Sequence, residues 1–377
     1  MAKILCPCCF EQFDDSEVEY LCLNMSRSRP CSKAQGKEKI AASEINPKNP
    51  VCPECHQKLS TKVCPYCGFT LPYSIGTIDS YPISIIGAKE SGKSNYVAVL
   101  IDELKNKVGG AFNCSLMASG DSTIARYRQQ FYNPLFRNRI CVQGTDAGEV
   151  TPLIYSLLFE REVKRGFFGR KESLTKAISL TFYDAAGENF DTKQDMDTFT
   201  KYLAHSSGII LLLDPLQLPV VRQELEGKIR LPQENTDVTD LLDRTIEVIR
   251  EQTGNMDMKR KIQIPIAVSF TKIDAVQGMI DDSSCLKNDS THIQKRAFDK
   301  VDFEQVNEEM KSLVDEWMGK ELINKVSKNF ENYGFFGLSA LGSNPDMDNK
   351  IPKFRPFRVA DPFLWILSEQ RLVPIAK

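Results

Sequence analysis

One short segment constrains this sequence more than any other: Gly87-Ala88-Lys89-Glu90-Ser91-Gly92-Lys93-Ser94. It follows the aliphatic run Ile83 to Ile86, which is typical of a buried strand, and precedes Asn95 to Leu104, which suits a helix. Glycines in such a loop let the backbone wrap closely around phosphate oxygens, and the start of the next helix attracts the same anion. The sequence therefore predicts a phosphate-binding loop, with contacts from Gly87, Ala88, Lys89, Glu90, Ser91, Gly92 and Asn95.

Two side chains of this loop have predicted roles toward a nucleoside triphosphate. Lys93 neutralises charge at the β- and γ-phosphates, and the hydroxyl of Ser94 binds Mg²⁺. The loop alone does not distinguish ATP from GTP. That choice depends on motifs farther along the chain.

The first of these motifs follows the run Ile178 to Tyr183 and reads Asp184-Ala185-Ala186-Gly187-Glu188. An aspartate at the end of a strand next to a phosphate loop can orient Mg²⁺ through water, and a glycine amide can meet the γ-phosphate. Asp184 and Gly187 are therefore predicted to detect whether the γ-phosphate is present.

Two further strand ends favour guanine over adenine. The run Ile264 to Phe270 ends in Thr271-Lys272-Ile273-Asp274, where a carboxylate can accept hydrogen bonds from the N1–H and N2–H₂ groups of guanine. Adenine offers no such pair of donors, so Asp274 is the predicted specificity residue and Lys272 is expected to pack over the base. Ser339-Ala340, after the run Phe335 to Leu338, is predicted to meet the guanine carbonyl with its backbone.

The aliphatic runs also predict the fold class. Continuous apolar runs such as Gly208 to Leu213 suit strands buried on both faces of a parallel sheet, with helices as the crossovers. Phe112 to Met117 and Pro152 to Phe159 are weaker strand candidates, and Thr175 to Tyr183 is a candidate partner for the second. Residues 78–377 are thus expected to form an α/β, doubly wound, mostly parallel sheet with helical insertions at 219–262 and 275–333.

The N-terminal residues 1–77 have a different composition, because they hold nine of the twelve cysteines. Clustered thiols at short spacings in a chain without an evident export signal indicate metal ligands rather than disulfides. The two Cys-x-x-Cys knuckles Cys52/Cys55 and Cys64/Cys67 predict a four-thiolate zinc site. A second site is predicted from Cys6, Cys9, Cys22 and Cys31, with Cys8 or His56 as alternative ligands. Such closed sites have a structural role, so residues 1–77 are expected to be a zinc-ribbon module.

Charge and hydropathy exclude some broad classes of protein. The chain has 48 Lys and Arg against 50 Asp and Glu, a formal net charge of −2, so it has no overall attraction for nucleic acid or anionic lipid. The longest aliphatic run, Ile209 to Leu213, is far too short to span a bilayer. We expect a cytoplasmic protein without membrane contact. The basic stretch from Arg27 to Lys39 has few aromatic neighbours, which favours protein docking over nucleic-acid binding.

The four nucleotide motifs, in this order and each at a strand end, resemble those of a P-loop GTPase of the translation-factor-related (TRAFAC) class. The N-terminal Cys6-Pro7-Cys8-Cys9 segment, the long G domain and the closing Arg358-Val359-Ala360-Asp361-Pro362-Phe363 resemble the bacterial double-GTPase family. That resemblance implies GTP and GDP as ligands, Mg²⁺ and Zn²⁺ as cofactors, a setting in bacterial conflict or defence, and a protein partner such as a second GTPase.

Two features of the GTPase pattern are altered or ambiguous here. The threonine that senses the γ-phosphate is either Thr145 or Thr151, and the sequence does not choose between them. Glu188 stands where many GTPases have a glutamine that orients the attacking water. Its negative charge faces the γ-phosphate, so unaided hydrolysis is expected to be slow. Compensating positive charge is expected from Lys89, at a position where dynamin-like GTPases place a polar catalytic residue, or from a partner.

These observations predict a GTP-hydrolysing switch that controls a protein partner. One alternative is a GTP-binding sensor or scaffold with little intrinsic hydrolysis, which Glu188 favours. Another is an RNA- or ribosome-linked GTPase that uses its zinc ribbon. The three histidines, His56, His205 and His292, have no acid-paired or metal-spaced neighbours in the sequence and are expected to have no catalytic role.

Overall fold

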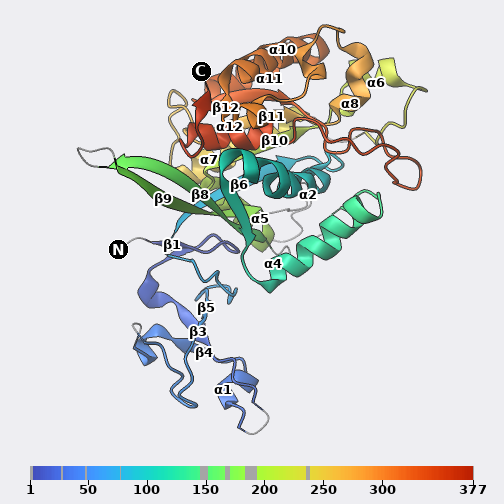
Figure 1. Ribbon diagram of the computed structural model, residues 1–377. Coiled ribbons are helices and arrows are strands. Elements are labelled where there is room, and N and C mark those ends of the chain that lie inside the picture. The colour runs from blue at the N-terminus through green and yellow to red at the C-terminus, as the bar shows by residue number, and fades with distance from the viewer. Residues whose placement is uncertain are drawn as a thin grey trace.

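The computed structural model describes residues 3–26, 29–46, 49–76, 78–144, 152–165, 170–182, 193–234 and 238–376. A small Cys-rich module at the N-terminus lies against a larger α/β domain (Figure 1). Strand β6, the first strand of the larger domain, begins at Asp79.

The α/β domain is built on a seven-stranded sheet with the order β13-β11-β10-β6-β9-β8-β7. The strands are β6 (Asp79–Gly87), β7 (Cys114–Ala118), β8 (Leu153–Arg165), β9 (Arg170–Phe182), β10 (Gly208–Leu213), β11 (Ile266–Phe270) and β13 (Tyr333–Gly337). Strand β6 is parallel to both β9 and β10, and β11 is parallel to both β10 and β13. Only the β7–β8 and β8–β9 pairs are antiparallel. The doubly wound, mostly parallel fold predicted from the sequence is confirmed.

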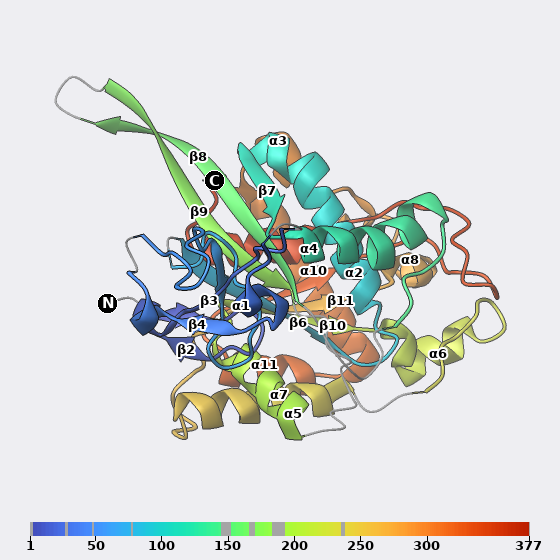
Figure 2. The same ribbon diagram turned by 90° about the horizontal axis from the view of Figure 1, so that it is seen from below.

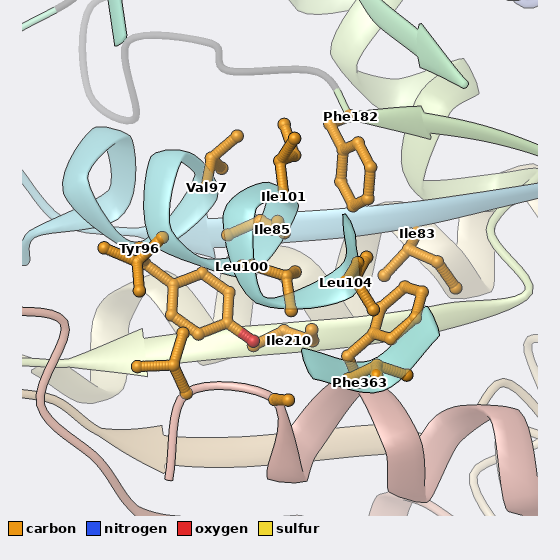
Figure 3. Close-up of a cluster of buried hydrophobic side chains, with 14 of the residues drawn as sticks. Ile83, Ile85, Tyr96, Val97, Leu100, Ile101, Leu104, Phe182, Ile210 and Phe363 are labelled. Atoms are coloured by element: carbon orange, nitrogen blue, oxygen red, sulfur yellow. The ribbon is translucent and has the colours of Figure 1, made fainter. Parts of the chain in front are cut away.

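Helices cover both faces of this sheet, whose central strands are largely apolar on both sides, and β10 carries no polar side chain at all. Along β10, Ile210 and Leu212 face one core, whereas Ile209, Leu211 and Leu213 face the other. The first core contains α2 (Lys93–Glu103) and α12 (Asp361–Glu369), and Figure 3 shows their side chains meeting above β6 and β10. The second core contains α5 (Lys193–Ala204), α6 (Pro219–Leu225), α7 (Val238–Thr253), α10 (Lys300–Met318) and α11 (Glu321–Asn329).

Most of the other elements of the domain are short. They include α3 (Gly109–Phe112), α4 (Asp121–Arg126), α8 (Ile273–Val276), α9 (His292–Lys295), the π-helical segments Leu104–Val108 and Tyr127–Arg137, and the parallel strands β12 (Phe298–Asp299) and β14 (Ile375–Ala376). The predicted strand at Phe112 to Met117 therefore begins later, at Cys114, because Phe112 ends a helix. Helices do occupy the predicted insertions. Among the described residues, no helix has the length and apolar character that crossing a bilayer demands.

The β8–β9 hairpin extends beyond the sheet as a two-stranded arm. Its strands pair with each other from Leu153–Phe182 to Arg165–Arg170. However, β7 pairs only with residues 155–159 of β8, and β6 only with residues 178–181 of β9. The outer half of the hairpin thus projects from the body of the domain (Figures 1 and 2). The sequence predicts the inner half of each strand but not this extension.

A buried ion-pair network holds the C-terminal helix. The guanidinium of Arg358 donates to Asp302 at 2.7 and 3.0 Å and to Asp361 at 2.9 Å. His292 lies in the same cluster, with its Nε2 3.8 Å from Oδ1 of Asp361, so the expectation that no acidic residue accompanies this histidine is wrong. Its partner is distant in the sequence, which is why spacing does not reveal it. Because Arg358 neutralises both carboxylates, the cluster has a structural role.

The Cys-rich module has its own small core and two small sheets. Strands β1 (Ile4–Leu5) and β2 (Gln12–Phe13) form a hairpin, and β3 (Glu19–Leu21) pairs on its two sides with β4 (Lys39–Ala41) and β5 (Thr61–Val63). Helix α1 spans Ser32–Gln35. All five buried cysteines of the chain lie in this core, so the thiols form a large part of it.

Candidate nucleotide-binding site

The predicted phosphate loop joins β6 to α2 in a tight turn. Glu90 and Gly92 adopt left-handed backbone conformations with φ of +64° and +86°, and the Ser91 amide donates to the Ala88 carbonyl at 3.1 Å. A Cβ on Gly87 would lie 2.5 Å from Oγ of Ser91 and 2.9 Å from the carbonyl oxygen of Leu212, so only glycine fits where the strand enters the loop. The loop therefore has the close turn that a phosphate cradle requires.

A cleft of about 940 Å³ opens above this loop. The described lining includes nearly all of the predicted nucleotide contacts: Ala88, Lys89, Glu90, Ser91, Gly92, Lys93, Ser94, Asn95, Thr271, Lys272, Asp274, Ser339 and Ala340. They meet because β6, β11 and β13 are parallel and end at the same edge of the sheet. Five other predicted site residues, Thr145, Thr151, Asp184, Gly187 and Glu188, lie outside the described residues.

Thr271 links the base motif to the phosphate loop. Its hydroxyl Oγ1 lies 3.0 Å from the carbonyl oxygen of Ser91 and 3.2 Å from that of Leu213, and it can donate to either. Its amide also donates to Leu213 at 2.8 Å. Thr271 is buried, so these bonds are shielded from water. The two halves of the cleft are thereby held in a fixed relation.

Lys272 is held by an acidic residue that the motif analysis missed. Its Nζ lies 2.6 Å from Oδ2 of Asp214, whose side chain is only 3% exposed. The other oxygen of Asp214 accepts from the amide of Leu216 at 3.0 Å, so both carboxylate oxygens are used. The available sequence signal is the position of Asp214 directly after a buried strand, at the same sheet edge as the other motifs.

Asp274, the predicted specificity residue, lines the same cleft. Burial raises the pKa of its carboxyl above the ordinary value, while the hydrogen bond with the Ser339 side chain and the nearby Lys272 act in the opposite direction. Ser339 is itself held, because its Oγ accepts from the amide of Gly342 at 2.8 Å. Asp274 and Ser339 thus form one hydrogen-bonded edge, to which a base with adjacent N–H donors is complementary.

Most of the remaining cleft wall comes from three segments without a recognisable motif, within residues 141–144, 230–233 and 341–345. Asn95, predicted as a ligand contact, accepts a hydrogen bond at its Oδ1 from the amide of Val142 at 2.9 Å. It therefore ties α2 to the chain that leads to Thr145. Asn344 donates through Nδ2 to the Arg230 carbonyl at 3.0 Å. These contacts join loops that are distant in sequence, so spacing does not predict them.

The chemistry of the cleft fits a magnesium nucleotide. Lys89 and Lys93 bring positive charge to a loop of backbone amides at a helix start, and Ser94 offers a hydroxyl oxygen of the kind Mg²⁺ binds. The buried Oγ of Ser91 has no hydrogen-bond partner among the described residues, so it can still bond to a ligand. Phosphate oxygens would satisfy these donors.

The eight predicted zinc ligands come together, but in a different grouping from the predicted one. Cys6 and Cys9 join Cys64 and Cys67, whereas Cys22 and Cys31 join Cys52 and Cys55. The cause is the antiparallel pairing of β3 with β5, in which Leu21 lies opposite Thr61 and Glu19 opposite Val63. Cys22 and Cys64 follow these strands and are therefore carried to opposite ends of the pair.

Both groups fit a tetrahedral zinc ion. The Sγ–Sγ distances are 3.8 Å for Cys6–Cys67 and Cys9–Cys64, 3.6 Å for Cys22–Cys55 and 3.8 Å for Cys31–Cys52. Zn–S bonds of about 2.3 Å in a tetrahedron place sulfur atoms roughly 3.8 Å apart. All twelve cysteines of the chain lie within the described residues and are free thiols. Each group would hold one ion, and neither Cys8 nor His56 is needed.

No family model matches the chain. A protein of Mycolicibacterium smegmatis named "Putative ESX-1 scaffolding and assembly protein SaeC" is 25% identical to it over 338 residues, which cover 83% of this chain and 80% of SaeC.

Solved structures similar to the chain include a variant of SsGBP (13% identity, 70% of this chain, TM-score 0.26) and the G domain of the T. maritima FeoB iron transporter (10%, 69%, 0.23). A third is Methanosarcina barkeri Roco2 bound to GDP (12%, 70%, 0.23). The chain spans 50% of the SsGBP chain, 88% of the FeoB domain and 44% of Roco2. These scores are low and carry no argument about function. The structure itself shows a doubly wound, mostly parallel α/β domain, with the phosphate loop and the base motif at one sheet edge, joined to a Cys-rich module.

Proposed function

We propose that this chain is a Mg²⁺-dependent GTPase whose GTP- and GDP-bound forms act differently on a protein partner. One observation supports this above the others: a single cleft contains both the phosphate loop and the Asp274–Ser339 edge. The first is a site for phosphates and the second matches the N–H donors of guanine. Adenine, which lacks that pair of donors, would leave the carboxylate poorly satisfied.

Within this proposal the roles of the side chains follow their chemistry. Lys93 binds the β- and γ-phosphates, and Ser94 and Asp184 hold Mg²⁺, directly and through water. Gly187 and either Thr145 or Thr151 respond to the γ-phosphate. Glu188 positions water poorly beside a phosphate of the same charge, so hydrolysis is slow. Lys89, which lines the cleft, or a cation from a partner supplies the missing positive charge.

The partner proposal rests on the similarity to SaeC, whose name describes scaffolding and assembly. A nucleotide-dependent role in assembling other proteins is consistent with a GTPase that turns over slowly. The resemblance to double GTPases adds a bacterial defence setting and a second GTPase as the candidate partner. The zinc-ribbon module would be the docking element, and we place the protein in the cytoplasm.

Competition among nucleotides tests the proposal directly. A fluorescent GDP analogue bound to the full chain with Mg²⁺ should be displaced by GDP and GTP but not by ADP or ATP. Lys93→Ala should abolish tight binding, whereas Lys300→Ala, which removes a lysine 63% exposed on α10, should leave it unchanged. Asp274→Asn should shift preference from guanine toward xanthine. Equal displacement by ATP, or unchanged binding by the Lys93 variant, would overturn the assignment.

Single-turnover hydrolysis then separates the switch from the two alternatives. A rate that rises when a partner is added identifies a switch, and a rate that stays near zero with every partner identifies a sensor or scaffold. An RNA-linked role would require salt-sensitive RNA binding that survives nucleotide removal but not zinc removal.

A further inference from the structure

The first knuckle of the Cys-rich module inserts an aromatic ring into the α/β domain. Phe10 directly follows Cys9 and has a left-handed backbone with φ of +56°. Its amide donates to the Cys6 carbonyl at 3.0 Å, closing the knuckle turn. The side chain is 1% exposed, and it belongs to the core on the α5 face of the sheet rather than to the core of its own module.

The ring of Phe10 rests on helix α5. Its centroid lies 4.9 Å from that of Tyr202, with the two planes inclined at 35°. The neighbouring Glu11 accepts a hydrogen bond, at 2.5 Å, from Nζ of Lys201, which lies on the same helix α5. Two consecutive knuckle residues therefore contact two consecutive α5 residues, one pair through apolar packing and the other through charge.

Helix α5 is in turn bonded to the strand that carries the phosphate loop. The hydroxyl of Tyr202 donates to the carbonyl of Ile83 at 2.5 Å, and the hydroxyl of Ser206, just beyond α5, is hydrogen-bonded to that of Ser84. Both partners lie on β6, which ends at Gly87. A continuous path of contacts thus runs from Cys9 through Phe10 and Tyr202 to Ile83, on the strand that leads into the phosphate loop.

The position of Phe10 depends on the thiol cluster. Cys6 and Cys9 define the knuckle turn, and their sulfur atoms face those of Cys67 and Cys64 at 3.8 Å. Zinc at this cluster would fix the turn and with it the direction of the ring. The second cluster contains no residue of this turn.

We propose that Phe10 is a positioning residue through which zinc at the Cys6, Cys9, Cys64 and Cys67 cluster strengthens nucleotide binding at the phosphate loop. This inference rests on the proposed function, since it takes guanine nucleotide as the ligand of the loop. Coupling between two binding sites is reciprocal, so bound nucleotide must raise the affinity of this cluster for zinc by the same factor.

The test compares two full-length variants with the same chemical change. Phe10→Leu replaces the ring that contacts Tyr202 with a smaller aliphatic side chain, whereas Phe13→Leu makes the same change at an equally buried ring within the core of the module. Both should retain two zinc ions per chain. The Kd for GDP with Mg²⁺ should rise about fivefold or more in Phe10→Leu. It should stay near the wild-type value in Phe13→Leu.

A second readout follows zinc rather than nucleotide. At equilibrium with a chromogenic chelator, the wild-type chain should retain more zinc when GDP is present, and this protection should shrink in Phe10→Leu. If that variant folds poorly, Tyr202→Phe keeps the ring but removes the hydrogen bond to Ile83, and it should reduce both GDP affinity and zinc protection.

Each outcome has a definite meaning. Unchanged GDP affinity and zinc protection in Phe10→Leu and Tyr202→Phe overturn the inference and leave the proposed function standing. An equal loss of affinity in Phe13→Leu also overturns it, because the effect would then be a general loss of module stability. A wild-type chain that binds no guanine nucleotide overturns the proposed function and the inference together.

Discussion

Nζ of Lys272 lies 2.6 Å from a carboxylate oxygen of the buried Asp214, so the base motif is anchored to the strand between it and the phosphate loop. The pair links the ends of β10 and β11. A lysine held in this way can keep its aliphatic stem against a base while its charge is satisfied.

Replacing Asp214 with Asn should therefore weaken nucleotide binding. The amide can still accept from Leu216, but it no longer balances the charge of Lys272. Because Lys272 is partly exposed, we expect a loss of about 1–2 kcal/mol in guanine-nucleotide binding rather than the larger cost of a fully buried pair. Titration calorimetry with GDP measures this difference in binding free energy between the wild type and the variant. Asp243→Asn breaks an exposed pair with Lys325 and should change nothing, so equal effects would contradict the role of Asp214.

Guanine binding should weaken as the solution is acidified, and at a higher pH than an exposed aspartate would allow. Burial raises the pKa of Asp274 above its ordinary value of 3.8, so protonation begins at a higher pH than for an exposed aspartate. Guanine donors need the ionised carboxylate, and affinity is therefore full above the raised pKa and falls as pH drops through it. The folding stability of the nucleotide-free protein depends on pH in the opposite sense. Protonation of Asp274 removes a buried charge, so its contribution to stability is present at low pH and is lost as pH rises through the raised pKa. GDP affinity measured against pH checks this, and Asp274→Asn should lose the dependence.

The crossed grouping of cysteines predicts which double variants retain a metal. Cys9→Ser with Cys67→Ser damages one cluster and should leave one bound Co²⁺ per chain, detected by its thiolate absorption. Cys9→Ser with Cys22→Ser damages both clusters and should leave none. Retention of one Co²⁺ by the second variant and of none by the first would support the grouping by sequence proximity instead.

Gly208 is predicted to resist any added side chain. A Cβ at this position would lie 2.4 Å from Cγ2 of Ile366 on α12, inside a closed core. Gly208→Ala should lower the free energy of unfolding by about 1–3 kcal/mol through overpacking. Gly110→Ala, a helical glycine with open space around its Cα, should be neutral or slightly stabilising. Thermal unfolding measures the stability of the two variants. Adding Ile366→Ala to Gly208→Ala should remove the clash, but the double variant still loses the packing of the Ile366 side chain.

The central strands can be predicted from sequence because strands buried on both faces are continuous apolar runs, as in Gly208–Leu213. The phosphate loop and the base motif are also visible, since each is contiguous in the chain. The outer part of the β8–β9 arm cannot be predicted in this way. Residues 160–165 and 170–173 are mostly charged, and their pairing follows from the register of the hairpin.

Asp214 illustrates why part of the site escapes sequence reasoning. A lone aspartate after a strand has no distinctive spacing. Its role in the site depends on the ion pair with Lys272, which follows the neighbouring strand. The zinc grouping fails for a similar reason. Proximity along the chain favours neighbouring knuckles, but the pairing of β3 with β5 decides which thiols meet.

The interleaved cysteine pairs also set an order of events during synthesis. Each cluster takes one pair from the first 31 residues and another from residues 52–67, so a nascent chain holds only half of either site until its second pair leaves the ribosome. The cluster beneath Phe10 needs Cys67 and is therefore the last to become complete, immediately before the strand of the phosphate loop emerges.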